Sequence, residues 1–496
     1  MSALKKLASQ TAIYGLSSII GRFLNYLLVP LYTYYFSPAE YGVVAEFYAY
    51  AGFFAVLLLL GFETGYFRFR DKEESKPGTA YSTALIFILG INLGFFLLVY
   101  LLQQPLATSL QYADYPQYVA WFAVILALDS VASIPFAKLR AENKAWRFAG
   151  IKLFEIAIVI ALNLFFIVYC PKAYAADSAS WVRWVYDPTI GVGYIFISNL
   201  IASACKFALL LPQWRGIAAG FDRALFARMW RYSLPMVIIG FAGIVNEMLD
   251  RVLLKHLLPY DLNTNLHQLG IYSACYKLAM LMSLFIQAFR YAAEPFFFAY
   301  AGQADARQVY ADVLRYFVIF CVGIFLLVSL YIDVFQYFIG PEYREGLRVV
   351  PVLLLANLML GIYVNLSIWY KLTDRTLLGA VVAVGGALLT LVLNLWWIPL
   401  MGYQGAAWAT LACYASMALV SYLLGRRYYP VHYRVGRILG YILFGVVLYL
   451  IHASLAAAGV LNSLLSATAC MAAFLVVVLR ADVRDLLAGL RSERPG

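Results

Sequence analysis

Two charged residues interrupt a stretch, residues 10–69, that otherwise reads as two long apolar helices joined by a tight corner. Arg22 lies in the first of these helices and Glu46 in the second. A charged side chain that faces hydrocarbon costs at least about 2.5 to 3.5 kcal/mol, so such residues normally face a protein interior or a water-filled cavity. The stretch therefore predicts membrane helices arranged around a lumen.

The corner between the two helices carries a helix-start signal. Ser37, Pro38, Ala39 and Glu40 form a capping box, in which Ser37 accepts from a free backbone N–H, Pro38 fits the first helical position and Glu40 reaches back to the cap. The second helix is therefore predicted to begin at this point.

Composition extends the membrane prediction to the whole chain. The 496 residues are 64% hydrophobic and 13% charged, with a mean hydropathy of +0.78, which is typical of a polytopic helical membrane protein. Apolar stretches of roughly 20 to 27 residues predict about fourteen spans: 10–36, 41–67, 79–102, 116–137, 148–170, 188–213, 232–258, 268–299, 309–338, 346–370, 376–400, 403–425, 436–456 and 459–479.

The positive charges follow the loops rather than a nucleic-acid surface. The net charge is +11, and most of the 37 Lys and Arg residues fall in alternate loops. Because cytoplasmic loops carry an excess of Lys and Arg, both termini are expected in the cytoplasm and no nucleic-acid partner is expected. Lys5 and Lys6 precede a span that is too long for a cleavable signal, so the first helix is expected to stay.

An internal repeat organises the spans. Arg22 precedes Gly42 much as Arg251 precedes Gly270, and each pair encloses a corner with Pro38 or Pro259. This similarity predicts two pseudo-symmetric six-helix lobes, residues 1–215 and 225–428, followed by two further spans in residues 432–480. Residues 481–496 are expected to form a short amphipathic helix on the cytoplasmic membrane surface, with a frayed tail as the alternative. In transporters a binding site commonly lies between such repeats.

Some intramembrane charges can neutralise one another within a single helix. The pairs Lys152 and Glu155, Glu247 and Arg251, and Arg290 and Glu294 are three or four residues apart and share a helix face. Asp250, adjacent to Arg251, is expected on a different face. The charges expected to need partners from other helices, or ligands, are Arg22, Lys206, Lys277, Glu46, Glu63, Asp129 and Asp250.

Cations in a lumen suit an anionic substrate, and phosphates are the usual one. We expect Arg22, Arg251, Lys277 and Arg290 to converge on such a group, with Arg22 and Arg251 facing one water-filled cavity. Glu63, Asp129 and Asp250 could instead bind Na⁺ or protons for coupling.

The sequence disfavours enzymes, ATP-driven pumps and metalloproteins. It contains no Walker loop, its four histidines have no zinc spacing, and no large external loop offers catalytic acids or arginines. Its six cysteines fall in or beside spans, where they are expected to pack. No cofactor or metal is expected.

Several segments resemble a known transporter group. These are the opening TAIYGLSSIIGRFLNYLLVPLY, the corner SPAEYG, and the later LDRVLL, LGIYSACYKLA and AFRYAAEPFFF. They are similar to the polysaccharide-transport branch of the multidrug/oligosaccharidyl-lipid/polysaccharide (MOP) exporter superfamily, which contains the Wzx-type O-antigen and oligosaccharide flippases.

This resemblance implies an alternating-access flippase of the bacterial inner membrane. Its substrate would be an undecaprenyl-pyrophosphate-linked glycan of lipopolysaccharide or another polysaccharide, and its partners would be membrane lipids and polysaccharide biosynthesis enzymes. The alternatives are a drug or metabolite exporter of the same fold, a peptidoglycan lipid-intermediate flippase, and a lipid scramblase or assembly scaffold.

Overall fold

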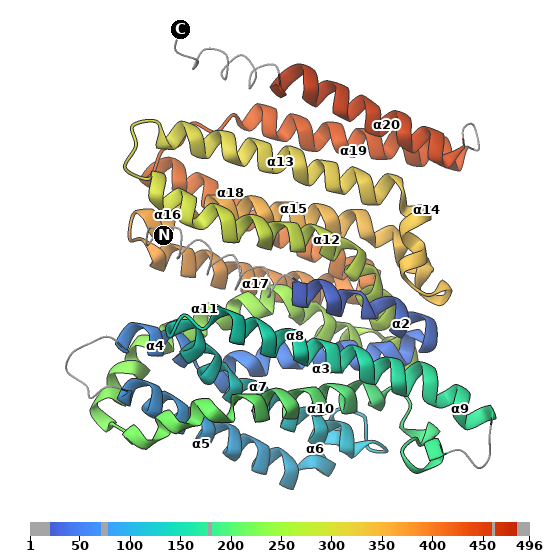
Figure 1. The fold of residues 1–496 in the computed structure, drawn as a ribbon. Coiled ribbons are helices and arrows are strands. Elements are labelled where there is room, and N and C mark those ends of the chain that lie inside the picture. The colour runs from blue at the N-terminus through green and yellow to red at the C-terminus, as the bar shows by residue number, and fades with distance from the viewer. Residues whose placement is uncertain (1–19, 71–77, 177–180, 459–461, 484–496) are drawn as a thin grey trace. The chain divides into compact units, whose positions relative to one another are not determined.

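Helices make up every regular element in the part of the chain that the computed structural model describes, residues 20–70, 78–176, 181–458 and 462–483 (Figure 1). The α-helices up to residue 300 are α2 (Leu28–Tyr35), α3 (Pro38–Leu59), α4 (Phe62–Phe69), α5 (Thr79–Leu101), α6 (Gln103–Ser109), α7 (Pro116–Ala141), α8 (Ala145–Asn163), α9 (Cys170–Ala176), α10 (Gly193–Leu210), α11 (Arg223–Leu257) and α12 (Leu262–Tyr300). The later ones are α13 (Ala306–Leu330), α14 (Ile332–Phe335), α15 (Val350–Leu366), α16 (Ile368–Leu372), α17 (Thr376–Met401), α18 (Tyr403–Tyr428), α19 (Val435–Ala457) and α20 (Ser463–Val478).

The predicted capping box at the start of α3 is confirmed. The Ser37 backbone N–H donates to Glu40 Oε2 over 2.9 Å, and the Glu40 backbone N–H donates to Ser37 Oγ over 3.4 Å. Pro38 is the first helical residue, where its missing N–H leaves no hydrogen bond unmade. Local sequence therefore fixes the position at which the chain turns back.

The described residues contain twelve helices that are long and apolar enough to cross a membrane. They match all the predicted spans except the first and the seventh. The first, residues 10–36, lies partly outside the described residues. The seventh is the continuous helix α11, which is less apolar because it carries Glu247, Asp250 and Arg251. About fourteen spans in an all-α membrane protein is therefore consistent with the structure.

Leucine side chains on the outer faces of several helices lie open to the surroundings. In α5, Leu93, Leu97 and Leu101 repeat at four-residue spacing, and Leu101 is 76% exposed. Exposed apolar stripes of this kind suit a surface in contact with lipid rather than water, since the backbone hydrogen bonds are satisfied inside each helix.

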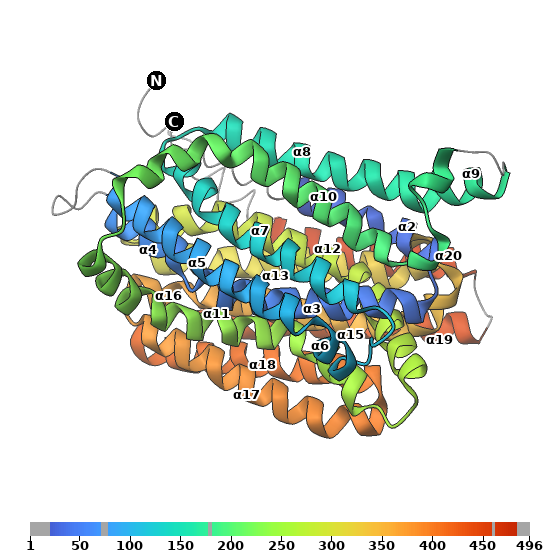
Figure 2. The ribbon, with the colours of Figure 1, turned by 90° about the horizontal axis from the view of Figure 1, so that it is seen from below.

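The chain divides into two compact units. The first comprises residues 1–270 with 390–399, and the second comprises residues 271–389 with 400–496. In the first unit α5 packs on α7, α7 on α10 and α10 on α8, while α3 packs against α11; Figure 2 shows α8 and α10 running side by side. In the second unit α15 packs on α18, and α13 on α19, which in turn contacts α20.

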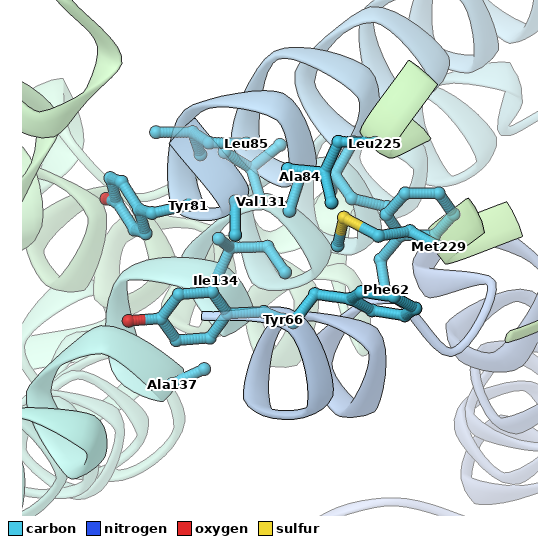
Figure 3. Packing of buried hydrophobic residues seen from close by; sticks show 13 residues of the cluster. Phe62, Tyr66, Tyr81, Ala84, Leu85, Val131, Ile134, Ala137, Leu225 and Met229 are labelled. Carbon is cyan, nitrogen blue, oxygen red and sulfur yellow. The ribbon is translucent and has the colours of Figure 1, made fainter. Parts of the chain in front are cut away.

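An aromatic cluster forms part of the core of the first unit. Phe62 and Tyr66 of α4 lie beneath Ile134 of α7, with Leu225 and Met229 of α11 beside them (Figure 3). These side chains are nearly or fully buried, and they join four helices of this unit, α4, α5, α7 and α11. The charged residues Glu63, Asp129, Arg251 and Lys255, described below, lie on these helices.

The predicted lobes, residues 1–215 and 225–428, remain a prediction. The boundary between the two compact units differs from the predicted one, since it falls within α12. The two predicted C-terminal spans correspond to α19 and α20. The predicted tail helix, residues 481–496, lies almost entirely outside the described residues.

Candidate functional site

The two predicted phosphate-binding arginines of the first unit differ in their surroundings. Arg22 is exposed, in a helical segment over residues 20–26. Arg251 of α11 is buried: its Nη1 lies 2.5 Å from the Glu247 carbonyl oxygen and 3.2 Å from Asp250 Oδ1. Arg251 is therefore already committed to groups on its own helix.

The pairing of Asp250 with Arg251 corrects the expectation that these neighbours point to different faces. The Asp250 carboxylate accepts from the Arg251 backbone N–H at 2.8 Å as well as from the guanidinium. The arginine stem is long enough to fold back across the helix surface, so adjacency in sequence does not separate the two charges.

The other two predicted cations belong to the second unit. Lys277 is half-buried on α12. The Arg290 side chain is 61% exposed, and its Nε lies 3.7 Å from Glu294 Oε2, which confirms the predicted pair. Lys371 of α16 binds the same carboxylate, so two cations share one negative charge. Whether the four cations of the two units converge stays a prediction.

Asp129 belongs to a network across three helices. Lys206 Nζ of α10 lies 2.7 Å from Asp129 Oδ1 of α7 and 2.5 Å from Glu155 Oε1 of α8. Ser203 donates to the same Asp129 oxygen over 2.6 Å, and Lys152 lies 3.5 Å from Glu155. The Lys206 side chain is only 3% exposed between the carboxylates, whereas 44% of the Asp129 side chain is exposed. The expectation that Lys206 and Asp129 find partners on other helices is confirmed.

Glu63, the third carboxylate proposed for coupling, lies at the end of the membrane helices. It forms an ion pair with Arg140, which joins α4 to α7, and both side chains are about one-third exposed. Each carboxylate proposed for Na⁺ or proton coupling thus contacts a basic side chain. A coupling ion would have to compete with that ammonium or guanidinium.

The most deeply buried ion pair in the described part of the chain joins Glu46, which the sequence predicts to need a partner, to a lysine that is not singled out from the sequence. Glu46 of α3 and Lys255 of α11 are both fully buried, and Lys255 Nζ lies 3.0 and 2.9 Å from the two Glu46 oxygens. The third acceptor of the ammonium is the Leu110 carbonyl oxygen, at 2.6 Å. Glu46 also accepts from the hydroxyls of Tyr50, at 2.8 Å, and Tyr112.

Glu46 is singled out from the sequence, whereas Lys255, which lies near the end of the predicted span 232–258, is not. The available signal was spacing, because Lys255 follows Arg251 by four residues and so lies on the same face of α11. Burial raises the pKa of Tyr112 well above its usual value, and the Glu46 charge adds to this effect. The Tyr112 hydroxyl therefore keeps the proton that it donates to Glu46.

Metal-binding chemistry finds no support in the described part of the chain. No group of three or more His, Cys, Asp or Glu side chains there is arranged to hold an ion. All six cysteines are free, and five of them are buried, as expected for packing residues.

Comparisons with known proteins agree with this architecture. The family described as "Polysaccharide biosynthesis protein" matches residues 7–300. The fold is similar to that of the structure titled "Lipid II flippase MurJ, inward closed conformation", with a TM-score of 0.71, 14% identity, and coverage of 95% of this chain and 99% of that chain. It is also similar to an inward-facing multidrug resistance MATE family transporter of the MOP superfamily, with a TM-score of 0.63, 13% identity, and coverage of 86% and 98%.

An outward-facing structure of a MATE family transporter matches with a TM-score of 0.56, 13% identity, and coverage of 84% of this chain and 94% of that chain. Comparison with curated protein sequences finds no match. The family match covers more than half of the chain, and the fold likeness covers nearly all of it. The chain therefore belongs to the polysaccharide biosynthesis protein family of the MOP superfamily, whose multi-pass membrane members are flippases and transporters.

Proposed function

We propose that this protein flips an undecaprenyl-pyrophosphate-linked oligosaccharide or polysaccharide repeat unit across the bacterial inner membrane by alternating access. Family membership supports a flippase with a lipid-linked glycan substrate. Both termini would lie in the cytoplasm, the protein would act as a carrier rather than an enzyme, and biosynthesis enzymes would supply the glycan.

The observation that carries the proposal is the state of Arg22. Among the described residues no carboxylate lies within ion-pair distance of it, although its segment is otherwise apolar. Arg22 shares a helix face with Tyr26 one turn later, which is buried, whereas Phe23 and Leu27 are 45% and 47% exposed. An exposed arginine that has no carboxylate partner among the described residues suits a diphosphate, which the guanidinium can bind with two parallel hydrogen bonds.

The remaining proposed binding residues would add charge around the same ligand. Arg290 shares Glu294 with Lys371, so positive charge is in excess there. Lys277 and Arg251 would contribute positive charge to the same site. Arg251 would first have to exchange its contact with Asp250 for a contact with phosphate. Coupling to Na⁺ or protons would involve Glu63, Asp129 or Asp250.

The test is flipping of a fluorescent undecaprenyl-pyrophosphate oligosaccharide in proteoliposomes. The native chain is compared with Arg22→Ala, Arg22→Lys and the control Lys144→Ala, which removes a cation that is already paired with Glu142. We expect loss of flipping with Arg22→Ala, partial retention with Arg22→Lys and native flipping in the control. The same glycolipid without its diphosphate should not be flipped.

Three results would point to another function. Extrusion of a soluble organic cation under an ion gradient, without glycolipid flipping, would indicate a drug exporter. Preference for a peptidoglycan lipid intermediate would replace the glycan class. Movement of every lipid at the same rate, unaffected by Arg22→Ala, would indicate a scramblase.

A further inference from the structure

The backbones of α3 and α12 touch at two glycines. A Cβ atom on Gly42 would lie 2.1 Å from the Leu266 carbonyl oxygen, and a Cβ atom on Gly270 would lie 1.8 Å from the Pro38 carbonyl oxygen. Both distances are far below any van der Waals contact, and the atoms in the way belong to the backbone. Only glycine permits this approach.

The contact is self-complementary. Pro38 precedes Gly42 by four residues, and Leu266 precedes Gly270 by four residues, so each helix presents its glycine to a carbonyl one turn earlier on the other. Such reciprocity is the signature of a local two-fold relation. Gly42 and Gly270 are also the residues that the sequence repeat predicts to be equivalent, so the two repeats meet at matching points.

The Glu46–Lys255 pair lies beside this crossing. Glu46 is one turn beyond Gly42 on α3. Asn265, next to Leu266, donates through Nδ2 to the carbonyl oxygens of Lys255 and Leu258, each at 3.0 Å. The buried ion pair and the glycine crossing are therefore joined by hydrogen bonds from the first turn of α12 to the end of α11.

We infer that the Gly42–Gly270 crossing and the Glu46–Lys255 pair form one seam, which closes one end of the transport path and separates in every transport cycle. This inference rests on the proposed function, since a flippase must part its two repeats to pass a substrate between them. The seam joins α3 of the first predicted lobe to α11 and α12 of the second.

The composition of the seam suits reversible closure. Every oxygen of Glu46 and the ammonium of Lys255 have protein partners while the seam is closed. When it opens, water can hydrate both charges, and the regained hydration offsets much of the lost attraction. The glycine crossing adds close packing without large side chains that would have to be pulled apart.

The experiment measures the reactivity of a cysteine placed in the seam. Leu266→Cys replaces a side chain that is 5% exposed, and modification of this introduced cysteine, the seam cysteine, by a water-soluble maleimide is followed by mass spectrometry. Gly270→Ala and Lys255→Met are added separately to the Leu266→Cys protein to weaken the seam. Gly90→Ala is the matched control, because a Cβ at Gly90 meets nothing within 4 Å.

We expect slow modification of the seam cysteine in the Leu266→Cys protein and in the control. Gly270→Ala and Lys255→Met should each raise the rate of modification of the seam cysteine at least about tenfold. A change of this size is expected when a minor open state becomes a major one. Adding the lipid-linked oligosaccharide should also raise the rate in the Leu266→Cys protein. Unchanged reactivity of the buried Cys170, in the first compact unit, and Cys413, in the second, shows that the variants remain folded.

Equal rates of seam-cysteine modification in all variants, with Cys170 and Cys413 still protected, would overturn the inference. The test separates the two proposals. If the variants open the seam but the native protein does not flip the glycolipid, the seam stands and the substrate assignment fails. If the native protein flips the glycolipid while the seam cysteine stays equally unreactive in every variant, the substrate assignment stands and the seam fails.

Discussion

Removing Lys255 should destabilise the protein far more than removing an exposed lysine. Lys255→Met keeps the length of the side chain but leaves the Glu46 carboxylate buried without its counter-charge, and the Leu110 carbonyl loses a donor at 2.6 Å. Breaking a buried ion pair by removing one partner costs about 3 to 5 kcal/mol. The hydroxyls of Tyr50 and Tyr112 still bind Glu46, so we expect the lower end, about 3 kcal/mol.

Adding Glu46→Gln to Lys255→Met should restore much of the lost stability. The glutamine carbonyl can still accept from a tyrosine, and no uncompensated charge remains. The native cysteines supply the assay, because five of the six are buried and become reactive on unfolding, which a thiol-reactive dye detects during heating. The control is Lys144→Met. The native Lys144 lies 2.7 Å from Glu142, but the lysine side chain is 50% exposed and the glutamate side chain 34%. Exposed ion pairs contribute about 0 to 1 kcal/mol to stability. The reasoning is refuted if Lys255→Met melts with the control, or if the double variant is no more stable than Lys255→Met alone.

Three further outcomes follow from the same geometry. Gly270→Ala should lower the melting temperature, because the alanine Cβ would lie 1.8 Å from the Pro38 carbonyl oxygen. Gly90→Ala, at an open helical position, should leave the melting temperature unchanged or raise it, and equal effects of the two substitutions would contradict the close crossing. Two hydrogen bonds from Thr264, the larger effect from its hydroxyl and the smaller from its backbone N–H, lower the pKa of Asp261. The Asp261 carboxylate, which caps α12, therefore stabilises the protein above its unfolded pKa of about 3.9, and this stabilisation is lost as the pH falls through the lower folded pKa. The melting-temperature deficit of Asp261→Asn, which keeps an acceptor oxygen, should therefore shrink below about pH 4, and a constant deficit would exclude a role for the charge. Lys206→Met removes the ammonium that lies between two carboxylates, so Na⁺ should raise the melting temperature of this variant and not that of the native chain. Equal responses would show that no cation replaces the ammonium.

Sequence patterns predict the all-α class and the helical spans because membrane helices are specified locally. Apolar length sets each span, and the capping box at Ser37 and Glu40 fixes a boundary to the residue. Alternate loop charges predict sidedness by the same local logic. None of these inferences requires knowledge of which helices are neighbours.

Partners between helices could not be predicted in the same way. Lys255 reaches Glu46 across 209 residues, and Arg140 reaches Glu63 across 77. Both lysine and arginine have long stems that carry the charge away from the position of the backbone, so a residue near the end of a helix can place its charge in the helical interior. The Asp250–Arg251 pair escaped prediction for the same reason.

The described charges separate into two groups with opposite expected responses to mutation. Glu46 with Lys255, and Lys206 with Asp129 and Glu155, form sets that satisfy one another within the packed helices. A substrate can gain little from them without first breaking protein contacts, so their loss should appear mainly as lost stability. Within the described ranges Arg22 has no ion pair and Arg290 has one long contact, 3.7 Å from Glu294, so their loss should leave stability near native and reduce binding of an anionic ligand instead. Measuring both quantities for one member of each group therefore separates residues that hold the helices together from residues that hold the substrate.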